Sequence, residues 1–387
     1  MAGWHWLTKP DSPYTPRFAL RVVIKATLLF LLLNAVYAVV QPLPFIQQFS
    51  LYNTVIDGRP RFPYADNPTE VYNLSIDRLE GMFAAHHIDG AAHRDDTFRV
   101  LMVGDSGVWG WLLTPDQTFS SCLNRGDFLT SDERRVDAYN LGYPIMNVLK
   151  DFMMMDYALR YEPDAIVWFV TLEGMFDSNQ LEHPILRRNQ ARVRDLIATY
   201  DLSLDINALP AEPTLLEQSI VGQRRELADW LRLQTYGLAW SVTGYDHTNP
   251  IFDRAPVSNF PPNESIPNRD FIAVGDPLAP HLALDVIEAA ITRAAQESVP
   301  VLLVNEPIFI GDGQNSDLRY NDFYPRWAYD QYRELMQIQA VENNWRYVDL
   351  WNFVPAERFT DFPLHYDAEY TCRVAERLVS DIIALAP

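Results

Sequence analysis

The feature that most constrains the fold is a regular alternation of short apolar runs with longer amphipathic segments. The apolar runs cover residues 98–103, 136–141, 165–170, 299–304 and 347–350. The segments between or after these runs have apolar residues at helical spacing. Strands that are apolar throughout are typical of a parallel sheet with helices on both faces. The sequence therefore predicts an α/β domain with a parallel sheet of about five strands, whose C-terminal ends share one edge.

The alternation stops between residues 177 and 276. Within this stretch, residues 214–242 have helical spacing, whereas residues 246–267 are rich in Pro and Asn. A structureless loop of such length is uncommon in a compact domain. We therefore expect an inserted helical cap with an ordered loop.

The N-terminal part carries a long uncharged apolar stretch, with no charged side chain between Lys25 and Asp57. Four basic residues lie on its N-terminal side, namely Lys9, Arg17, Arg21 and Lys25. This asymmetry predicts a cytoplasmic tail (1–21), a transmembrane signal anchor (22–45), a juxtamembrane segment (46–97) and an extracytoplasmic domain (98–387). Small residues at Val36-Tyr37-Ala38 leave cleavage by a signal peptidase open as an alternative.

Charge and cysteine content exclude several functions. The chain has 51 acidic and 31 basic side chains, a formal charge of −20, which repels nucleic acid. Cys122 and Cys372 are the only cysteines, so we expect neither a metal centre nor a cofactor, and no disulfide-rich scaffold. Both fall on expected helices beside the site proposed below. Two buried free thiols are the more common arrangement, and export would permit a disulfide instead.

The first strand ends abruptly at Gly104-Asp105-Ser106-Gly107. A turn of this kind lifts a serine hydroxyl out of the sheet, and the following helix offers backbone N–H groups to developing negative charge. The same residues also form ordinary helix caps. A nucleophilic serine needs a base, and His365 follows the last strand with Asp361 four residues before it. We therefore predict that Ser106, His365 and Asp361 act together.

Three sequence blocks resemble the SGNH/GDSL hydrolases: Gly104-Asp105-Ser106, Asn140-Leu141-Gly142, and Asp361 with His365 before the C-terminal helix. The resemblance covers residues 98–387 without the insertion. It implies a flavodoxin-like three-layer α/β/α fold. It also implies that Ser106 attacks an ester as nucleophile, that His365 is the base and that Asp361 orients it. The backbone N–H groups of Ser106 and Gly142 would form the oxyanion hole.

The chain departs from that family at three places. The third block normally reads Gly-x-Asn-Asp, but residues 171–177 read Thr-Leu-Glu-Gly-Met-Phe-Asp. The family's asparagine would donate its amide to the oxyanion, whereas Glu173, when ionised, would repel it. The nearest amide side chain along this loop is that of Asn179. Asp361 stands four rather than three residues before His365, and Tyr370 replaces a glycine that often follows the histidine.

Further polar residues near the strand ends are candidates for contact with a substrate. They are Asp105, Glu173, Asn179, Asn305 and Asn321, the last within an aromatic-rich loop at residues 319–327. We expect a serine ester hydrolase outside the cytoplasm, acting on O-acyl groups of a glycan or lipid. Two alternatives stay open: an acyltransferase for a cell-surface polysaccharide, and an inactive membrane-tethered binding protein, which the missing asparagine favours.

Overall fold

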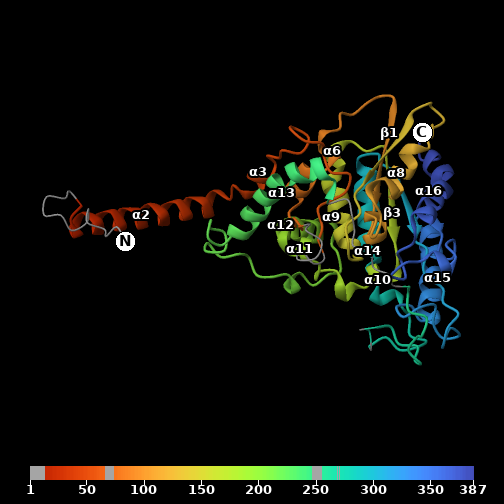
Figure 1. Ribbon diagram of the computed structural model, residues 1–387. Helices are drawn as coiled ribbons and strands as arrows, with labels where there is room; N and C mark the ends of the chain where they lie inside the picture. Colours follow the sequence, from red (N-terminus) through yellow and green to blue (C-terminus); the bar gives the residue numbers. More distant parts are fainter. Residues whose placement is uncertain (1–13, 66–73, 246–254, 268, 270) are drawn as a thin grey trace.

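A single long helix projects from an α/β domain in the computed structural model, which describes residues 14–65, 74–245, 255–267, 269 and 271–387 (Figure 1). This helix, α2 (Pro16–Val40), is the one helix of the described residues long and apolar enough to cross a membrane. Thr15 caps its N-terminus, and Gln41 ends it with a left-handed backbone (φ 50°). It therefore starts before the expected segment, 22–45, and ends five residues earlier. The short helix α3 (Leu43–Gln47) follows.

Five parallel strands form the sheet in the order β2-β1-β3-β4-β5. Their bounds are β1 (Thr97–Val103), β2 (Arg135–Asn140), β3 (Ala165–Val170), β4 (Val301–Asn305) and β5 (Arg346–Asp349). This order is that of the flavodoxin-like doubly wound fold. The expected fold class is thus confirmed, and each strand lies within two residues of its predicted place.

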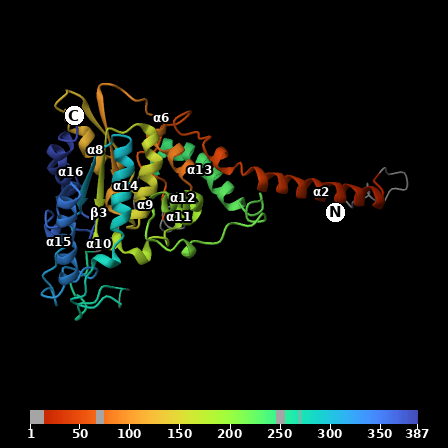
Figure 2. The ribbon, with the colours of Figure 1, turned by 180° about the vertical axis from the view of Figure 1, so that it is seen from behind.

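Helices cover both faces of the sheet because successive strand side chains point to opposite sides. Leu101, Val103 and Trp168 belong to one hydrophobic cluster, whereas Val100 and Met102 belong to the other. The first face packs against α9 (Val148–Ala158), α14 (Leu284–Gln296) and α15 (Arg326–Glu342). The second packs against α8 (Phe119–Arg125) and α16 (Ala368–Ile383). Figure 2 shows the resulting three layers from behind.

The insertion contains three α-helices in its described residues: α11 (Pro184–Arg188), α12 (Gln190–Tyr200) and α13 (Arg224–Thr243). Helix α12 packs on α9, where Arg192 pairs with Asp156 at 2.8 Å. Helix α13 packs on the juxtamembrane segment, where the Leu51 N–H donates to Gln234 Oε1 at 2.6 Å. The helices of the predicted cap therefore form a layer beside α9. Residues 246–254 of its loop lie outside the described residues.

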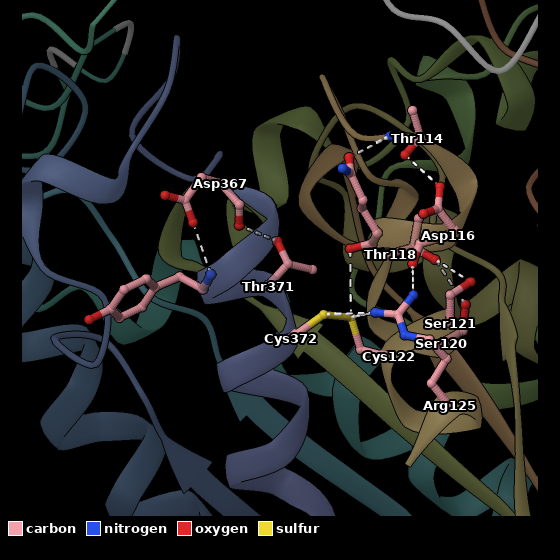
Figure 3. The surroundings of a disulfide bond; sticks show 12 residues. Thr114, Asp116, Thr118, Ser120, Ser121, Cys122, Arg125, Asp367, Thr371 and Cys372 are labelled. Carbon is pink, nitrogen blue, oxygen red and sulfur yellow. Dashed lines mark hydrogen bonds between the residues drawn. A yellow bond between two sulfur atoms is a disulfide. The ribbon is translucent and has the colours of Figure 1, made fainter. Parts of the chain in front are cut away.

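A disulfide joins Cys122 of α8 to Cys372 of α16, with the two Cα atoms 5.2 Å apart (Figure 3). Of the two arrangements that the sequence left open, the structure has the disulfide and not the more common pair of free thiols. The two helices pack side by side on one face of the sheet, which brings the cysteines within the range of a disulfide. The Arg125 guanidinium also contacts both sulfur atoms, at 3.2 Å from Cys372 Sγ and 3.4 Å from Cys122 Sγ.

Loss of this disulfide should destabilise the domain. The bond closes a loop with a sequence separation of 250 residues, and loop entropy then contributes about 5 kcal/mol. We expect the double variant Cys122→Ser/Cys372→Ser to unfold on the order of 10 °C below the wild type in a thermal scan. A reductant should lower the melting temperature of the wild type and leave that of the variant unchanged. Equal melting temperatures without reductant would contradict the prediction.

Candidate active site

Ser106 is the first residue of α7 (Ser106–Trp109), which begins just after β1 ends. Asp105 caps this helix, because its Oδ1 accepts the Gly107 N–H at 2.7 Å. A Cβ atom at Gly107 would lie 3.3 Å from the Leu364 carbonyl oxygen. Glycine at this position therefore lets the loop that carries the histidine approach the serine closely.

The structure brings Ser106, His365 and Asp361 into one hydrogen-bonded chain. Ser106 Oγ lies 2.7 Å from His365 Nε2, and His365 Nδ1 lies 3.0 Å from Asp361 Oδ1. The longer spacing is accommodated because the Thr360 N–H donates to the His365 carbonyl oxygen at 2.8 Å and closes the loop. With a proton on Nδ1, Nε2 is free to accept the serine proton.

A tryptophan that the sequence did not single out completes this arrangement. Trp111 Nε1 donates to Asp361 Oδ2 at 3.0 Å. Burial alone would raise the pKa of Asp361, but hydrogen bonds from His365 and Trp111, together with attraction to His365, bring its pKa below the usual value. Asp361 therefore stays ionised and holds the imidazole. The sequence feature that could have pointed to this role is a tryptophan five residues after the serine.

Two aromatic rings lie against the histidine, and a third lies behind one of them. The Trp111 and His365 rings are stacked with centroids 6.0 Å apart, and the Phe362 ring lies 5.1 Å from that of His365. Tyr64 contacts Trp111 edge-on, with centroids 6.4 Å apart. Tyr64 comes from the juxtamembrane segment, which supplied no candidate in the sequence, so this segment contributes to the site.

The same segment also contacts α7 and the residues that follow it. Arg61 Nη1 donates to the carbonyl oxygens of Gly110 and Leu113, both at 3.0 Å, and its guanidinium lies over the Trp109 ring. The Trp109 indole N–H donates to the Phe62 carbonyl oxygen at 2.9 Å. These contacts fix the end of α7, and with it the direction in which Ser106 points.

Gly142 lies against α7, the helix that begins with Ser106, as the expected role of its N–H as an oxyanion donor requires. A Cβ atom there would lie 2.3 Å from the Trp109 backbone nitrogen, so only glycine fits. However, the Gly142 N–H donates to Asn140 Oδ1 at 3.0 Å. An oxyanion would have to share this N–H with Asn140. The N–H of Ser106 is the first of its helix, where no intrahelical acceptor is available.

A fully buried lysine ties together the two loops that carry these groups. Lys150 Nζ donates to the Gly104 carbonyl oxygen at 3.1 Å and to the Tyr143 carbonyl oxygen at 2.5 Å. It also lies 2.9 Å from Asp151 Oδ1. Burial raises the pKa of Asp151, and Lys150 opposes that shift. Lys150 was not a candidate from the sequence.

Glu306, the residue after β4, belongs to the same buried group. Burial raises its pKa well above the usual value, and repulsion from Asp105 and Asp151 adds to the shift. Asp105 is itself only 4% exposed, and its Oδ2 has no hydrogen-bond partner among the described residues. Glu306 therefore retains its proton to higher pH than an ordinary glutamate, which limits the negative charge beneath the serine.

Removal of the Lys150 charge should strongly destabilise the protein. In Lys150→Met the carboxylate of Asp151 is buried without its cation, and breaking a buried ion pair in this way costs about 3–5 kcal/mol. Urea unfolding should report this loss. The double variant Lys150→Met/Asp151→Asn removes the stranded charge and should recover part of it. If the double variant is no more stable than the single one, lost packing rather than charge explains the effect.

Glu173 is the second residue of α10 (Leu172–Met175), the short helix that follows β3. It follows β3 by three residues, as Ser106 follows β1, and the two strands are neighbours. Burial raises the pKa of Glu173 to about 7, against the attraction of Arg269, whose Nη2 lies 3.7 Å away. Near neutral pH the side chain is thus partly protonated. A protonated carboxyl donates a hydrogen bond, as the amide of an asparagine does.

The Glu173 pKa should also show in the pH dependence of stability. A carboxyl whose pKa is raised from 4.5 to about 7 on folding stabilises the protein at low pH and loses that contribution as pH rises through this window. Relative to the wild type, Glu173→Gln should therefore gain up to about 3 kcal/mol between about pH 4 and pH 8. Urea unfolding at both pH values tests this. The exposed neighbour Glu182→Gln is the control, and equal pH profiles of Glu173→Gln and wild type would refute the prediction.

Two of the expected substrate contacts lie in the core. Asn305 and Asn321 are both 0% exposed. The Asn305 amide bonds Asp349 and two tyrosine hydroxyls, whereas the Asn321 amide bonds backbone groups of its own loop and the Phe309 carbonyl oxygen. Internal bonds use both amides, which corrects the expectation that they contact a substrate.

The remaining candidates differ in position. Asp105 is buried, and its Oδ1 caps α7 as described above. Asn179 ends a short turn after α10, is partly exposed and accepts a hydrogen bond from Asn147 through its backbone carbonyl. Within the described residues, no three His, Cys, Asp or Glu side chains gather in a way that would hold a metal ion.

The fold and the site together define an α/β protein with a Ser-His-Asp arrangement at the C-terminal edge of its sheet. No protein-family model and no curated protein matches the sequence. Among solved structures, a carbohydrate acetylesterase family member from Sinorhizobium meliloti is similar, with 12% identity, 75% of this chain and 99% of that chain covered, and a TM-score of 0.33.

Two further solved structures are similar to a comparable degree. The inhibitor-bound aryl esterase of M. Smegmatis shares 10% identity over 74% of this chain and 99% of its own, with a TM-score of 0.37. A member of the lipolytic protein G-D-S-L family from Veillonella parvula shares 10% over 73% and 96%, with a TM-score of 0.34. Because these TM-scores are low, we assign the fold from the order of the strands in the sheet. We describe the candidate site from its own interatomic distances.

Proposed function

We propose that this chain is a serine-dependent ester hydrolase of the SGNH type. The observation that carries the proposal is the hydrogen-bonded chain from Ser106 through His365 to Asp361. As Ser106 Oγ attacks the ester carbonyl carbon, His365 Nε2 takes the hydroxyl proton. The imidazolium then gives this proton to the leaving alcohol, which departs and leaves an acyl group on Ser106. Asp361 stabilises the imidazolium throughout.

Water completes the cycle by the same steps in reverse. His365 takes a proton from water as its oxygen attacks the acyl carbonyl, and returns it to Ser106 Oγ when the carboxylic acid leaves. The N–H groups of Ser106 and Gly142 stabilise the oxyanion in both halves. Glu173 supplements them in its protonated form and opposes them when ionised, in place of the amide that residues 171–177 lack.

The site is proposed to lie outside the cytoplasm. Helix α2 acts as the signal anchor, with Arg17, Arg21 and Lys25 on its cytoplasmic side. The disulfide between Cys122 and Cys372 supports this location, because such bonds persist in oxidising compartments. The substrates are O-acyl groups of a glycan or lipid, and the rings of Tyr64, Trp111 and Phe362 offer apolar faces to them.

The geometry favours an enzyme over an inactive binding protein. A serine hydroxyl 2.7 Å from an imidazole nitrogen, with a carboxylate on the other nitrogen, is the arrangement that activates a nucleophile. Transfer of the acyl group to a sugar hydroxyl would use the same acyl-enzyme. Transfer would be favoured by a cap that excludes water from the acyl-enzyme. The described helices of the insertion instead pack on α9 and on the juxtamembrane segment, so hydrolysis remains the proposed reaction.

A fluorophosphonate probe, which reacts covalently with activated serines, tests the proposal. The intact chain should be labelled, Ser106→Ala should not, and His365→Ala and Asp361→Asn should react at least about a hundredfold more slowly. Ser241→Ala on the exposed face of α13 and His281→Ala are the matched controls and should label as the wild type does. A folded wild type that resists the probe, or a Ser106→Ala variant that still reacts, would overturn the assignment.

A further inference from the structure

Helix α2 is tied to the insertion by a polar residue in its apolar stretch. Asn34 is only 9% exposed. Its Nδ2 donates to the Phe30 carbonyl oxygen at 2.9 Å, and its Oδ1 accepts the Val221 backbone N–H at 3.2 Å. Both ribbon views show the chain before α13 reaching back beside the last turns of α2 (Figures 1 and 2).

The position of Asn34 sets the depth of this contact, if α2 spans a membrane as proposed above. A hydrocarbon layer of about 30 Å needs about 20 helical residues. Counted from Arg21, the last basic residue but one, such a span reaches Gln41, so Asn34 lies about 10 Å inside its far boundary. Because Val221 is hydrogen-bonded to Asn34, residues around Val221 lie at the same level, close to the roughly 5–10 Å depth that the apolar faces of interfacial elements reach.

The side chains of residues 214–222 suit a lipid environment. Leu215 and Leu216 are 67% and 71% exposed, and Val221 is 38% exposed. Turns within the segment satisfy much of its backbone: the Gln218 and Ser219 N–H groups donate to carbonyl oxygens of the same segment. Such internal bonding is what a segment in contact with lipid requires. Exposed apolar side chains of this size otherwise mark an interaction surface.

Charged residues on either side limit how deeply the segment enters. Glu217 lies beside the two leucines, its carboxylate bonded to the Thr214 N–H at 2.8 Å, and Arg224 and Arg225 follow at the start of α13. Charges flanking an apolar edge are typical of elements that lie at the lipid headgroup level. The exposed rings of Phe45 and Phe49, just after α2, match the aromatic residues found at such interfaces.

We propose that residues 214–222 form a second membrane contact, which inserts Leu215 and Leu216 into the lipid interface beside α2. The partner is the bilayer that α2 crosses, and the hydrogen bond between Asn34 and Val221 makes the contact continuous with the helix. The inference rests on the proposed membrane anchor and is independent of the ester chemistry.

A fluorophore sensitive to its environment tests this contact in the full chain. Both native cysteines are in the disulfide, so Leu216→Cys provides a single thiol for an NBD label in lipid nanodiscs. We expect the label emission to shift to the blue and to be quenched by lipids brominated on their acyl chains. Val341→Cys, which replaces a 73% exposed residue of α15, is the matched control and should keep the emission of water. Leu215→Cys provides a second position.

A label within α2 separates the two hypotheses. Leu29, 57% exposed, should report lipid as Leu29→Cys if the helix spans the bilayer. If the label at Leu29 is in lipid while labels at positions 215 and 216 match the control, the anchor holds and the second contact is refuted. If all these labels match the control, the anchor itself fails, and the second contact fails with it. A thermal unfolding scan of each variant, which does not depend on the ester chemistry, checks that the domain remains folded.

Discussion

The buried ammonium of Lys150 is the interaction on which the geometry of the site depends. It bonds the carbonyl oxygens of Gly104 and Tyr143, and thus joins the loops that end β1 and β2. These loops carry Ser106 and Gly142. A buried cation is tolerated only where charge and hydrogen bonds surround it, and here Asp151 provides the charge. Electrostatics beneath the sheet edge, in addition to apolar packing, therefore hold the loops of Ser106 and Gly142 together.

Apolar patterns in the sequence were sufficient to predict the sheet and the two ends of the site. Runs such as 165–170 are apolar throughout, and only a strand between two helical layers buries both faces. Because parallel strands end at one edge, Ser106 and His365 could be placed together without a structure. Trp111 could not, because an indole near a strand end looks the same whether it packs in the core or bonds a carboxylate. Its role depends on where the loop of Asp361 folds.

The same reasoning explains where the prediction failed. Asn305 and Asn321 occupy strand ends and loops, as substrate-binding residues do, but nearby hydroxyls and backbone groups in the fold use their amides. Sequence position cannot tell which partners a side chain finds. The sequence left the disulfide undecided for a related reason. Its two cysteines are 250 residues apart, and only the packing of α8 against α16 brings them together.

Helix α2 and the candidate site are linked by a short series of contacts between described residues. Helix α13 bonds the juxtamembrane segment through Gln234 and Leu51, and that segment supports α7 through Phe62 and Trp109. In Figures 1 and 2 the strands run across the direction of α2. If α2 spans a bilayer, the strand edge that carries Ser106 then faces along the membrane surface at a fixed height. Access to a substrate would then depend on that height, since hydrogen bonds between described residues connect α2, the insertion, the segment before β1 and α7.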